Sequence, residues 1–286
     1  MIEIDALVRW CACGHDNQKI ALAAWNHGMT GLLYKHTPDP LLKQALFVNY
    51  AMATANTVAH MTVLRTIRKA GLEFLPFKGA SLILRGLYPQ DERPLLDLDL
   101  LVKPENLSDF VEYARSIGFR PQPTSNPTGI SLHRGRLNMD LHTTPFMPEL
   151  HIPVHQLWNK SQNGLLALEH EMLIVALHAA KSSTTTGLRL IWWVDMMRLR
   201  QRADLSRARK IASSWGVERL FSRTLLAQPI EFLNSPGSLG AVAKLRLSGF
   251  AGRNPGLTVM RLVGAGLVRM GFGTATKRTF KATERA

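Results

Sequence analysis

Two aspartates, Asp97 and Asp99, alternate with leucines in an apolar stretch. If this stretch is a strand, both side chains lie on the same face. Neighbouring carboxylates repel each other and lose hydration when half-buried, so a cation between them would stabilise the arrangement. Mg²⁺ prefers carboxylate oxygens and commonly leaves its other positions to water and substrate phosphates. The pattern therefore points to phosphate chemistry, although such a pair can also lie on a solvated strand face without this role.

A third acid, Asp140, lies in a similar alternating stretch that predicts another short strand. His142 follows on the same face, where it would either support the acids or form an ordinary hydrogen bond in the core. Before the acids, an apolar run breaks at Lys78-Gly79 and resumes with helical spacing after Ser81. This break predicts a strand, a turn and a helix.

In this order the elements resemble the DNA polymerase beta-like nucleotidyltransferase superfamily. They look most like a bacterial group of uncharacterised nucleotidyltransferases with a Lys-Gly turn before an Arg-Pro-x-x-Asp-x-Asp strand. The residues that carry the resemblance, over about residues 40–200, are Lys78, Gly79, Arg93, Pro94, Asp97, Asp99, Asp140, His142, His178, Arg189, Leu190 and Asp195. The resemblance implies an α+β fold: a short mixed sheet flanked by helices, with N-terminal helices and a C-terminal helical region.

The activity that the resemblance implies is transfer of a nucleoside monophosphate from a nucleoside triphosphate such as ATP to an acceptor, with release of pyrophosphate. Asp97 and Asp99 would bind two Mg²⁺ ions, with Mn²⁺ as the alternative metal. Two such ions, about 3.5 to 4 Å apart, stabilise the attacking and leaving oxygens together. Asp140 would complete the catalytic metal's ligands and take up the acceptor's proton.

The predicted nucleotide-binding residues are Lys78, Gly79, Ser81 and Arg93. Gly79 would let phosphates approach the backbone N–H groups at a helix start, and the two cations would offset phosphate charge. The usual turn of the superfamily is Gly-Ser or Gly-Gly, whereas Ala80 follows the glycine here. Ser81 or Lys78 would therefore have to replace the missing serine contact.

Each of the two cations also has a structural interpretation. Lys78 could be a solvated lysine at a strand end. Arg93 could form an ion pair with Asp97 or a neighbouring residue.

Further polar residues, His178, Lys181, Arg189 and Asp195, fall in two predicted helices at 168–180 and 188–202. The resembling group packs this region beside the active site, so these residues and His142 are candidates for a supporting shell around the acids. A salt bridge between Arg189 and Asp195 is the structural alternative.

The chain divides by pattern into four parts. Residues 1–70 predict N-terminal helices, with apolar stripes at 17–33 and 40–69. Residues 71–160 predict the catalytic core, including a helix at 104–118 and a hairpin of 129–133 with 136–142. Residues 161–235 predict a helical domain, and residues 236–286 form a basic, Gly-containing tail.

The tail holds nine Lys and Arg residues against one acid, in a chain of net charge +14. It could be a solvated tail, a segment that contacts RNA or DNA phosphates, or one that attaches weakly to anionic lipid through residues 257–270.

Composition limits the remaining classes. A chain of 286 residues, 46% hydrophobic, can bury a substantial core. Its first residues are acidic, no apolar run reaches the length of a membrane span, and Cys11 and Cys13 lie too close for an ordinary disulfide. We therefore expect a cytoplasmic protein with reduced thiols, where nucleoside triphosphates are present. P-loop and dinucleotide-binding motifs do not occur in the sequence.

The acceptor is not encoded in a recognisable motif: a small molecule, a peptide, a protein side chain or a tRNA end would each fit. A second hypothesis, motivated by the Gly79-Ala80 turn, is a catalytically silent nucleotide- or RNA-binding module with the same fold.

Overall fold

The structure, a computed structural model, describes residues 16–122, 129–146, 150, 152–182 and 188–227. Its centre is a mixed sheet of five short strands in the order β1-β2-β5-β4-β3. The strands are β1 (Leu75–Pro76), β2 (Leu98–Leu101), β3 (Arg120–Pro121), β4 (Gly129–Arg134) and β5 (Leu137–His142). Only the β2–β5 pair is parallel among these neighbours. The predicted α+β fold with a short mixed sheet is thus confirmed.

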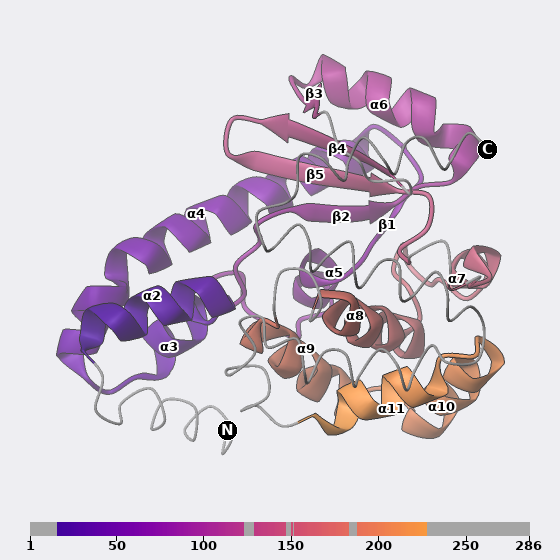
Figure 1. Cartoon of the computed structure of the whole chain (residues 1–286). Helices are drawn as coiled ribbons and strands as arrows, with labels where there is room; N and C mark the ends of the chain where they lie inside the picture. The colour runs from indigo at the N-terminus through magenta and orange to yellow at the C-terminus, as the bar shows by residue number, and fades with distance from the viewer. Residues whose placement is uncertain (1–15, 123–128, 147–149, 151, 183–187, 228–286) are drawn as a thin grey trace, which may run out of the picture.

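Helices cover this sheet on both faces (Figure 1). Before it come α2 (Asn17–His27), α3 (Thr30–His36) and α4 (Pro40–Lys69). Within it lie α5 (Gly79–Leu84), the 3-10 turn η1 (Pro104–Asn106) and α6 (Leu107–Ser116). After it come α7 (Val154–Asn159), α8 (Leu168–Ser182), α9 (Leu190–Arg200), α10 (Leu205–Ser214) and α11 (Glu218–Leu226). Helix α6 lies on one side of the sheet, and α8 to α11 gather on the other (Figure 1).

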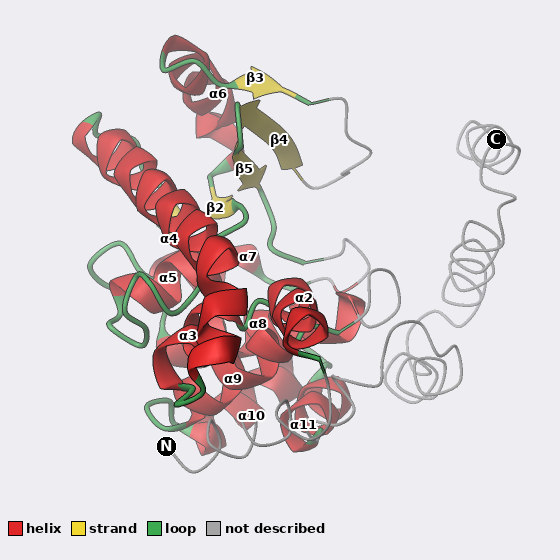
Figure 2. Ribbon diagram, turned by 90° about the vertical axis from the view of Figure 1, so that its left-hand side faces the viewer, coloured by secondary structure: helices red, strands yellow, loops and turns green. Residues whose placement is uncertain are grey.

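Helix α4 joins the helical half of the molecule to the sheet (Figure 2). It begins where the Asp39 side chain accepts the first free N–H groups and Pro40 fixes the first turn. Halfway along, Thr57 Oγ1 accepts the Leu95 N–H at 2.9 Å, and Asn56 Nδ2 donates to the Leu95 carbonyl at 2.6 Å. The helix therefore holds the chain directly before the two aspartates.

The loop segment 88–92 is packed between three helices. Asp91 accepts hydrogen bonds from Tyr50 of α4 at 2.9 Å and from Lys35 of α3 at 2.6 Å. Glu92 lies 3.3 Å from the guanidinium of Arg198 on α9. These contacts fix the approach to Arg93.

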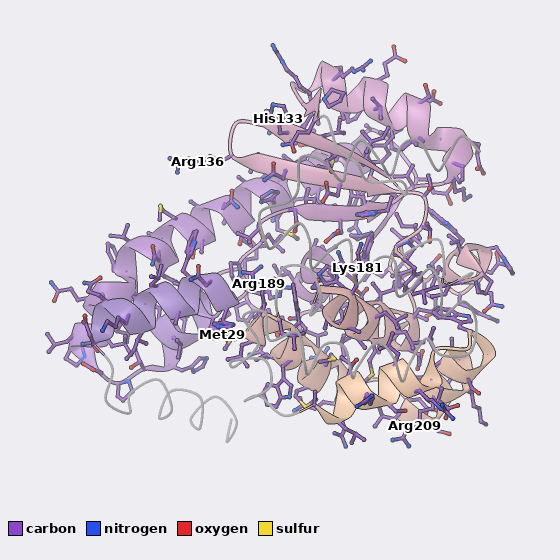
Figure 3. All side chains as sticks on the ribbon, viewed as in Figure 1. Met29, His133, Arg136, Lys181, Arg189 and Arg209 are labelled. Atoms are coloured by element: carbon purple, nitrogen blue, oxygen red, sulfur yellow. The ribbon has the colours of Figure 1, made fainter. Side chains whose placement is uncertain are left out.

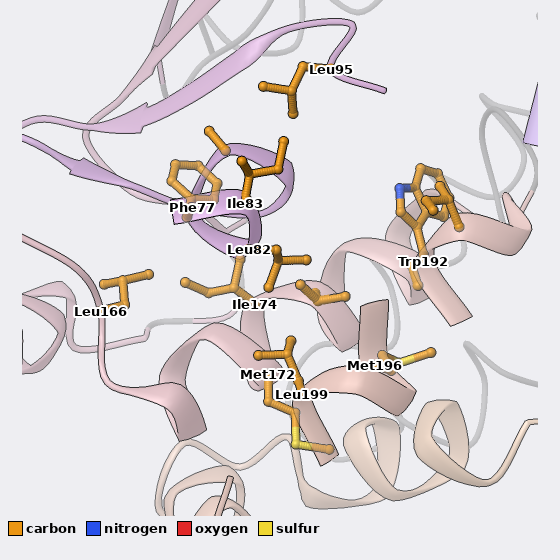
Figure 4. Close-up of a cluster of buried hydrophobic side chains, with 14 of the residues drawn as sticks. Phe77, Leu82, Ile83, Leu95, Leu166, Met172, Ile174, Trp192, Met196 and Leu199 are labelled. Carbon is orange, nitrogen blue, oxygen red and sulfur yellow. The ribbon is translucent and has the colours of Figure 1, made fainter. Parts of the chain in front are cut away.

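The apolar core continues through α5 into the helical half. Figure 4 shows Leu82 and Ile83 of α5 close to Ile174 of α8, with Phe77 beside them. All four side chains are buried in one cluster. Helix α5 is consequently fixed between the sheet and α8, although it has only six residues.

Several local predictions are confirmed: the hairpin, the helix of residues 104–118, which forms as η1 and α6, and the helices α8 and α9. One prediction is wrong in detail. Strand β2 begins at Leu98, so Asp97 lies in a bend before the strand rather than within it. The reason is that Leu95 bonds to α4, and pairing with β5 starts only at Leu98 opposite Met139.

Some predictions concern parts of the chain outside the described residues: Cys11, Cys13 and the basic tail 236–286, with its nucleic-acid and lipid alternatives. In the described part of the chain, no helix has both the length and the apolar character needed to cross a membrane.

Gly31 of α3 is a test of the packing around segment 88–92. A Cβ on this residue would come within 2.5 Å of the Glu92 carbonyl oxygen, which is backbone and cannot move away easily. We expect Gly31→Ala to lower the free energy of unfolding by about 1–3 kcal/mol, despite the better helix propensity of alanine. Urea unfolding measures this, with Ala51→Ser on the exposed face of α4 as the control. Equal stabilities of all three proteins would contradict the close packing.

Candidate active site

Two acids from separate strands lie side by side in the sheet. Because β2 and β5 run parallel, Asp99 and Asp140 are direct neighbours in the register. His142 comes two residues after Asp140 on β5. One ligand atom each from Asp99, Asp140 and His142 lies within 4.8 Å of the others. The sheet therefore gathers two carboxylates and an imidazole at one point.

Asp99 is the most enclosed of these groups, with 6% of its surface exposed. Its Oδ1 accepts hydrogen bonds from Lys78 Nζ at 2.8 Å and from the Nε2–H of His142 at 3.1 Å. Burial alone would raise the pKa of Asp99, but the Lys78 ammonium and the His142 imidazole hold it well below its usual range. Asp99 is thus an ionised carboxylate that accepts hydrogen bonds from the Lys78 ammonium and the His142 imidazole.

The pKa of Asp97 is shifted in the opposite direction from that of Asp99. Asp97 reaches solvent, and it stands outside the compact group of three. Desolvation by the surrounding protein and the charge of Asp99 raise its pKa to about 6, with Asp140 adding to the effect and Lys78 opposing it. Burial next to two other carboxylates therefore disfavours the charged form of Asp97.

The Lys-Gly turn lies next to these acids. Lys78 connects β1 to α5 with φ 56° and ψ −133°, a backbone conformation that costs a non-glycine residue about 1–3 kcal/mol. Its N–H donates to Glu171 Oε1 at 2.6 Å, and its ammonium reaches Asp99. Gly79 is packed so closely that a Cβ would come within 2.5 Å of the Leu95 side chain. The turn is therefore held on both sides.

Ser81 forms its hydrogen bonds with two side chains inside the protein. It is fully buried, and its hydroxyl donates to Glu171 Oε2 at 2.6 Å while accepting from Arg85 Nε at 3.2 Å. The expected contact of Ser81 with phosphate does not fit this arrangement, because both functions of the hydroxyl are used inside the protein. Ser81 instead links the turn to Glu171 of α8.

Arg93 is also engaged within the protein. Its guanidinium forms two hydrogen bonds with Asp195 of α9, Nε to Oδ1 at 3.0 Å and Nη2 to Oδ2 at 2.8 Å. Both partners are almost completely buried. Of the two interpretations from the sequence, this is the structural one, and Asp195 pairs with Arg93 where the sequence had suggested Arg189. The pair ties the chain before Asp97 to the helical half.

Three further basic side chains belong to the helical half: His178 and Lys181 of α8, and Arg189 directly before α9. Figure 3 labels Lys181 and Arg189 between the sheet and the lower helices. Burial, with the nearby charge of Arg93, lowers the pKa of Arg189 to about 10, while Asp97 and Asp195 oppose this shift. Burial lowers the pKa of His178 well below its usual value, and the Lys78 ammonium adds to the effect. Both residues therefore feel the charges of the candidate site.

Two residues of the site were missed by sequence reasoning: Glu171 and Arg85. Glu171 has no exposed surface, and Arg85 donates to the Leu166 carbonyl and lies 3.9 Å from Glu171. The available signal was an acid, Glu171, immediately before the apolar run Met172 to Leu177 of a helix. A charge in such a place requires a buried partner.

Glu171 gives the protein a measurable pH dependence. Burial raises its pKa from 4.5 to about 7, so between these values the folded protein keeps a proton that the unfolded chain has released. Wild-type stability therefore falls across this window as pH rises, relative to Glu171→Gln, whose amide does not titrate. We expect the difference in unfolding free energy to move in favour of the variant by up to about 3 kcal/mol. Urea unfolding at several pH values measures it, and two parallel stability curves would contradict the shift.

The chain also matches a known family of proteins. A family model described as uncharacterised nucleotidyltransferase matches residues 15–228, which include every helix and strand that the structure describes, from α2 to α11. No curated protein matches the chain. Since the match covers well over half of the sequence and the whole cluster of acids, the protein belongs to this uncharacterised nucleotidyltransferase family.

Proposed function

We propose that this protein is a metal-dependent nucleotidyltransferase of the DNA polymerase beta-like type, which moves a nucleoside monophosphate from a nucleoside triphosphate to an acceptor. The observation that carries the proposal is the pairing of Asp99 with Asp140 across parallel strands, with Asp97 just before the strand. The pKa of Asp97, raised by burial and by the charges of Asp99 and Asp140, supports the proposal, because a bound cation would stabilise its carboxylate form.

The donor set fits a hard divalent cation. Carboxylate oxygens of Asp99 and Asp140 lie within reach of one ion, and Asp97 responds to the charges of both. Mg²⁺ is the natural candidate for such oxygens, and Mn²⁺ accepts the same ligands together with the His142 imidazole. When bound, the metal would neutralise phosphate charge and lower the barrier to attack at phosphorus.

Lys78 has a defined part in this proposal. In the structure its ammonium compensates Asp99 at 2.8 Å. A cation bound to Asp99 would compete with this contact and release the ammonium toward the triphosphate. Arg189 and His178 lie on the helical side of the acids, where Arg189 would add a second positive charge for the phosphates.

The reaction itself is an in-line displacement. An acceptor hydroxyl, or a similar nucleophile, forms a new bond to the α-phosphorus, and the bond from this phosphorus to the bridging oxygen breaks. Pyrophosphate leaves with the bonding electrons. Asp140 accepts the proton of the acceptor, while Lys78 offsets the charge that develops on the leaving group.

Replacing the acids tests the function directly. We expect Asp97→Asn, Asp99→Asn and Asp140→Asn each to lower transfer by more than about 100-fold, since each removes a candidate metal ligand. The measurement is transfer of label from each of the four α-³²P ribonucleoside triphosphates, with Mg²⁺ and cell extract as the source of acceptor. Nuclease or protease sensitivity of the labelled product then identifies the acceptor class.

Asp109→Asn is the matched control, because Asp109 is an exposed aspartate on α6, away from the candidate site. It should transfer label like the wild type. Asp97→Asn should also unfold at the same urea concentration as the wild type or higher, because it removes a charge that its surroundings disfavour. Nucleotide binding by the wild type without any transfer would favour the silent binding module instead.

Metal binding provides a second measurement, independent of turnover. Mn²⁺ titrated into the protein and followed by electron paramagnetic resonance should bind about tenfold or more weakly to Asp99→Asn than to the wild type. Lys78→Met should bind Mn²⁺ more tightly than the wild type in the absence of nucleotide, because the competing ammonium is gone. Unchanged Mn²⁺ affinity in both variants would show that Asp99 is not a metal ligand.

A further inference from the structure

Glu171 contacts the Lys-Gly turn from outside the group of acids. It belongs to α8, 93 residues after Lys78. One carboxyl oxygen accepts the Lys78 N–H at 2.6 Å, and the other accepts the Ser81 hydroxyl at 2.6 Å. A single side chain thus binds both ends of the turn.

The conformation of Lys78 depends on such support. Its φ of 56° is rare for a residue with a side chain, and it persists only where the surroundings enforce it. On one side, the Phe77 N–H donates to the Asp99 carbonyl at 3.1 Å and fixes the chain entering the turn. On the other side, Glu171 fixes the peptide N–H of Lys78 itself. Together they direct the ammonium at Asp99.

The cost of placing Glu171 here argues for a role beyond stability. Its side chain is 0% exposed, and a buried carboxyl is less favourable than an apolar group of similar size unless its hydrogen bonds are needed. Arg85, at 3.9 Å, compensates it only partly, and burial still raises its pKa to about 7. Among the described residues, the polar contacts of Glu171 are with Lys78, Ser81 and Arg85 rather than with Asp99 or Asp140, so its effect on these acids must pass through Lys78.

We propose that Glu171 is a positioning residue for the phosphate-binding lysine: by accepting the Lys78 N–H and the Ser81 hydroxyl, it keeps the Lys78 turn in the conformation that presents the ammonium to the site. The inference rests on the proposed nucleotidyltransferase function for its consequence, but the contact itself can be tested separately.

The first test measures how firmly the Lys78 turn is held in the protein without any ligand. Glu171→Ala removes both acceptors, whereas Glu171→Gln keeps an amide oxygen for the Lys78 N–H and an N–H₂ group that can donate to Ser81. Hydrogen exchange of backbone amides, followed by NMR, should show the Lys78 amide exchanging at least about tenfold faster in Glu171→Ala and near the wild-type rate in Glu171→Gln. Amides of β5 should be unchanged.

The control for this test is Glu169→Ala. Glu169 lies on the same helix, is 9% exposed and accepts the Asp204 N–H at 3.4 Å rather than contacting the turn. This variant should leave the Lys78 amide at its wild-type rate. Faster exchange throughout the molecule in Glu171→Ala, or the same loss in Glu171→Gln, would show a general structural role and overturn the proposal.

The second test reads phosphate binding with inorganic tripolyphosphate and Mg²⁺, measured by calorimetry at fixed salt. Glu171→Ala should weaken binding about tenfold, and Glu171→Gln should stay within about threefold of the wild type. Because Glu171 acts through Lys78, adding Glu171→Ala to Lys78→Met should cause no further loss. Additive losses, or a Glu171→Ala protein that binds like the wild type, would overturn the proposal.

The two tests separate this inference from the proposed function. If the wild type transfers no nucleotide and binds no tripolyphosphate, the proposed function fails, and exchange at the Lys78 amide still decides whether Glu171 holds the turn. If transfer and binding are present but the Lys78 amide exchanges equally fast in Glu171→Ala and the wild type, the function stands and the positioning role fails.

Discussion

The parallel pairing of β2 with β5 is the constraint on which the site depends. It sets Asp99 beside Asp140, and like charges at this distance are tolerated only with compensation. The protein supplies it locally through Lys78 and His142, which both contact Asp99. The charge of Lys78 also opposes the raised pKa of Asp97, so one lysine balances much of the cluster. The charge balance of the cluster therefore depends on how the rest of the fold positions Lys78.

Two buried acids of the helical half hold the chain segments that flank the site. Glu171 of α8 holds the Lys78 turn, and Asp195 of α9 holds Arg93 in the segment that leads to Asp97. Each contact joins a helix to a chain segment flanking the site, and each lies in a region of close apolar packing. Removing Asp195 would leave the buried charge of Arg93 uncompensated, and removing Glu171 would leave the Lys78 N–H and the Ser81 hydroxyl without their acceptors, so the helices and the site are energetically coupled. The sheet alone would present the acids without fixing the groups around them.

Much of this arrangement could be predicted from sequence, because local patterns determine it. Alternation around Asp99 and Asp140 indicated two strands, and Lys78-Gly79 marked the turn. The partners of Ser81 and Arg93 could not be predicted in the same way. Ser81 turns toward Glu171, and Arg93 binds Asp195, because α8 and α9 pack beneath the turn. Such long-range choices depend on three-dimensional packing, which spacing along the chain does not contain. The start of β2 was misplaced for the same reason, since hydrogen bonds from α4 hold Leu95 outside the sheet.

The hydrogen bond from Ser81 to Glu171 bears on how the Gly79-Ala80 turn would serve the proposed phosphate chemistry. A serine that contacted phosphate would leave Glu171 without its second donor, and a buried carboxyl with an unsatisfied oxygen is costly. Because Ser81 is bonded to Glu171, the proposed function assigns the phosphate contact to the Lys78 ammonium, which lies on a flexible side chain and already points at Asp99. In this proposal, the phosphate contact that a serine hydroxyl makes in the usual turn is made by the Lys78 ammonium instead. Under the proposed function, binding of the triphosphate would then depend on how firmly the protein holds the backbone of that lysine.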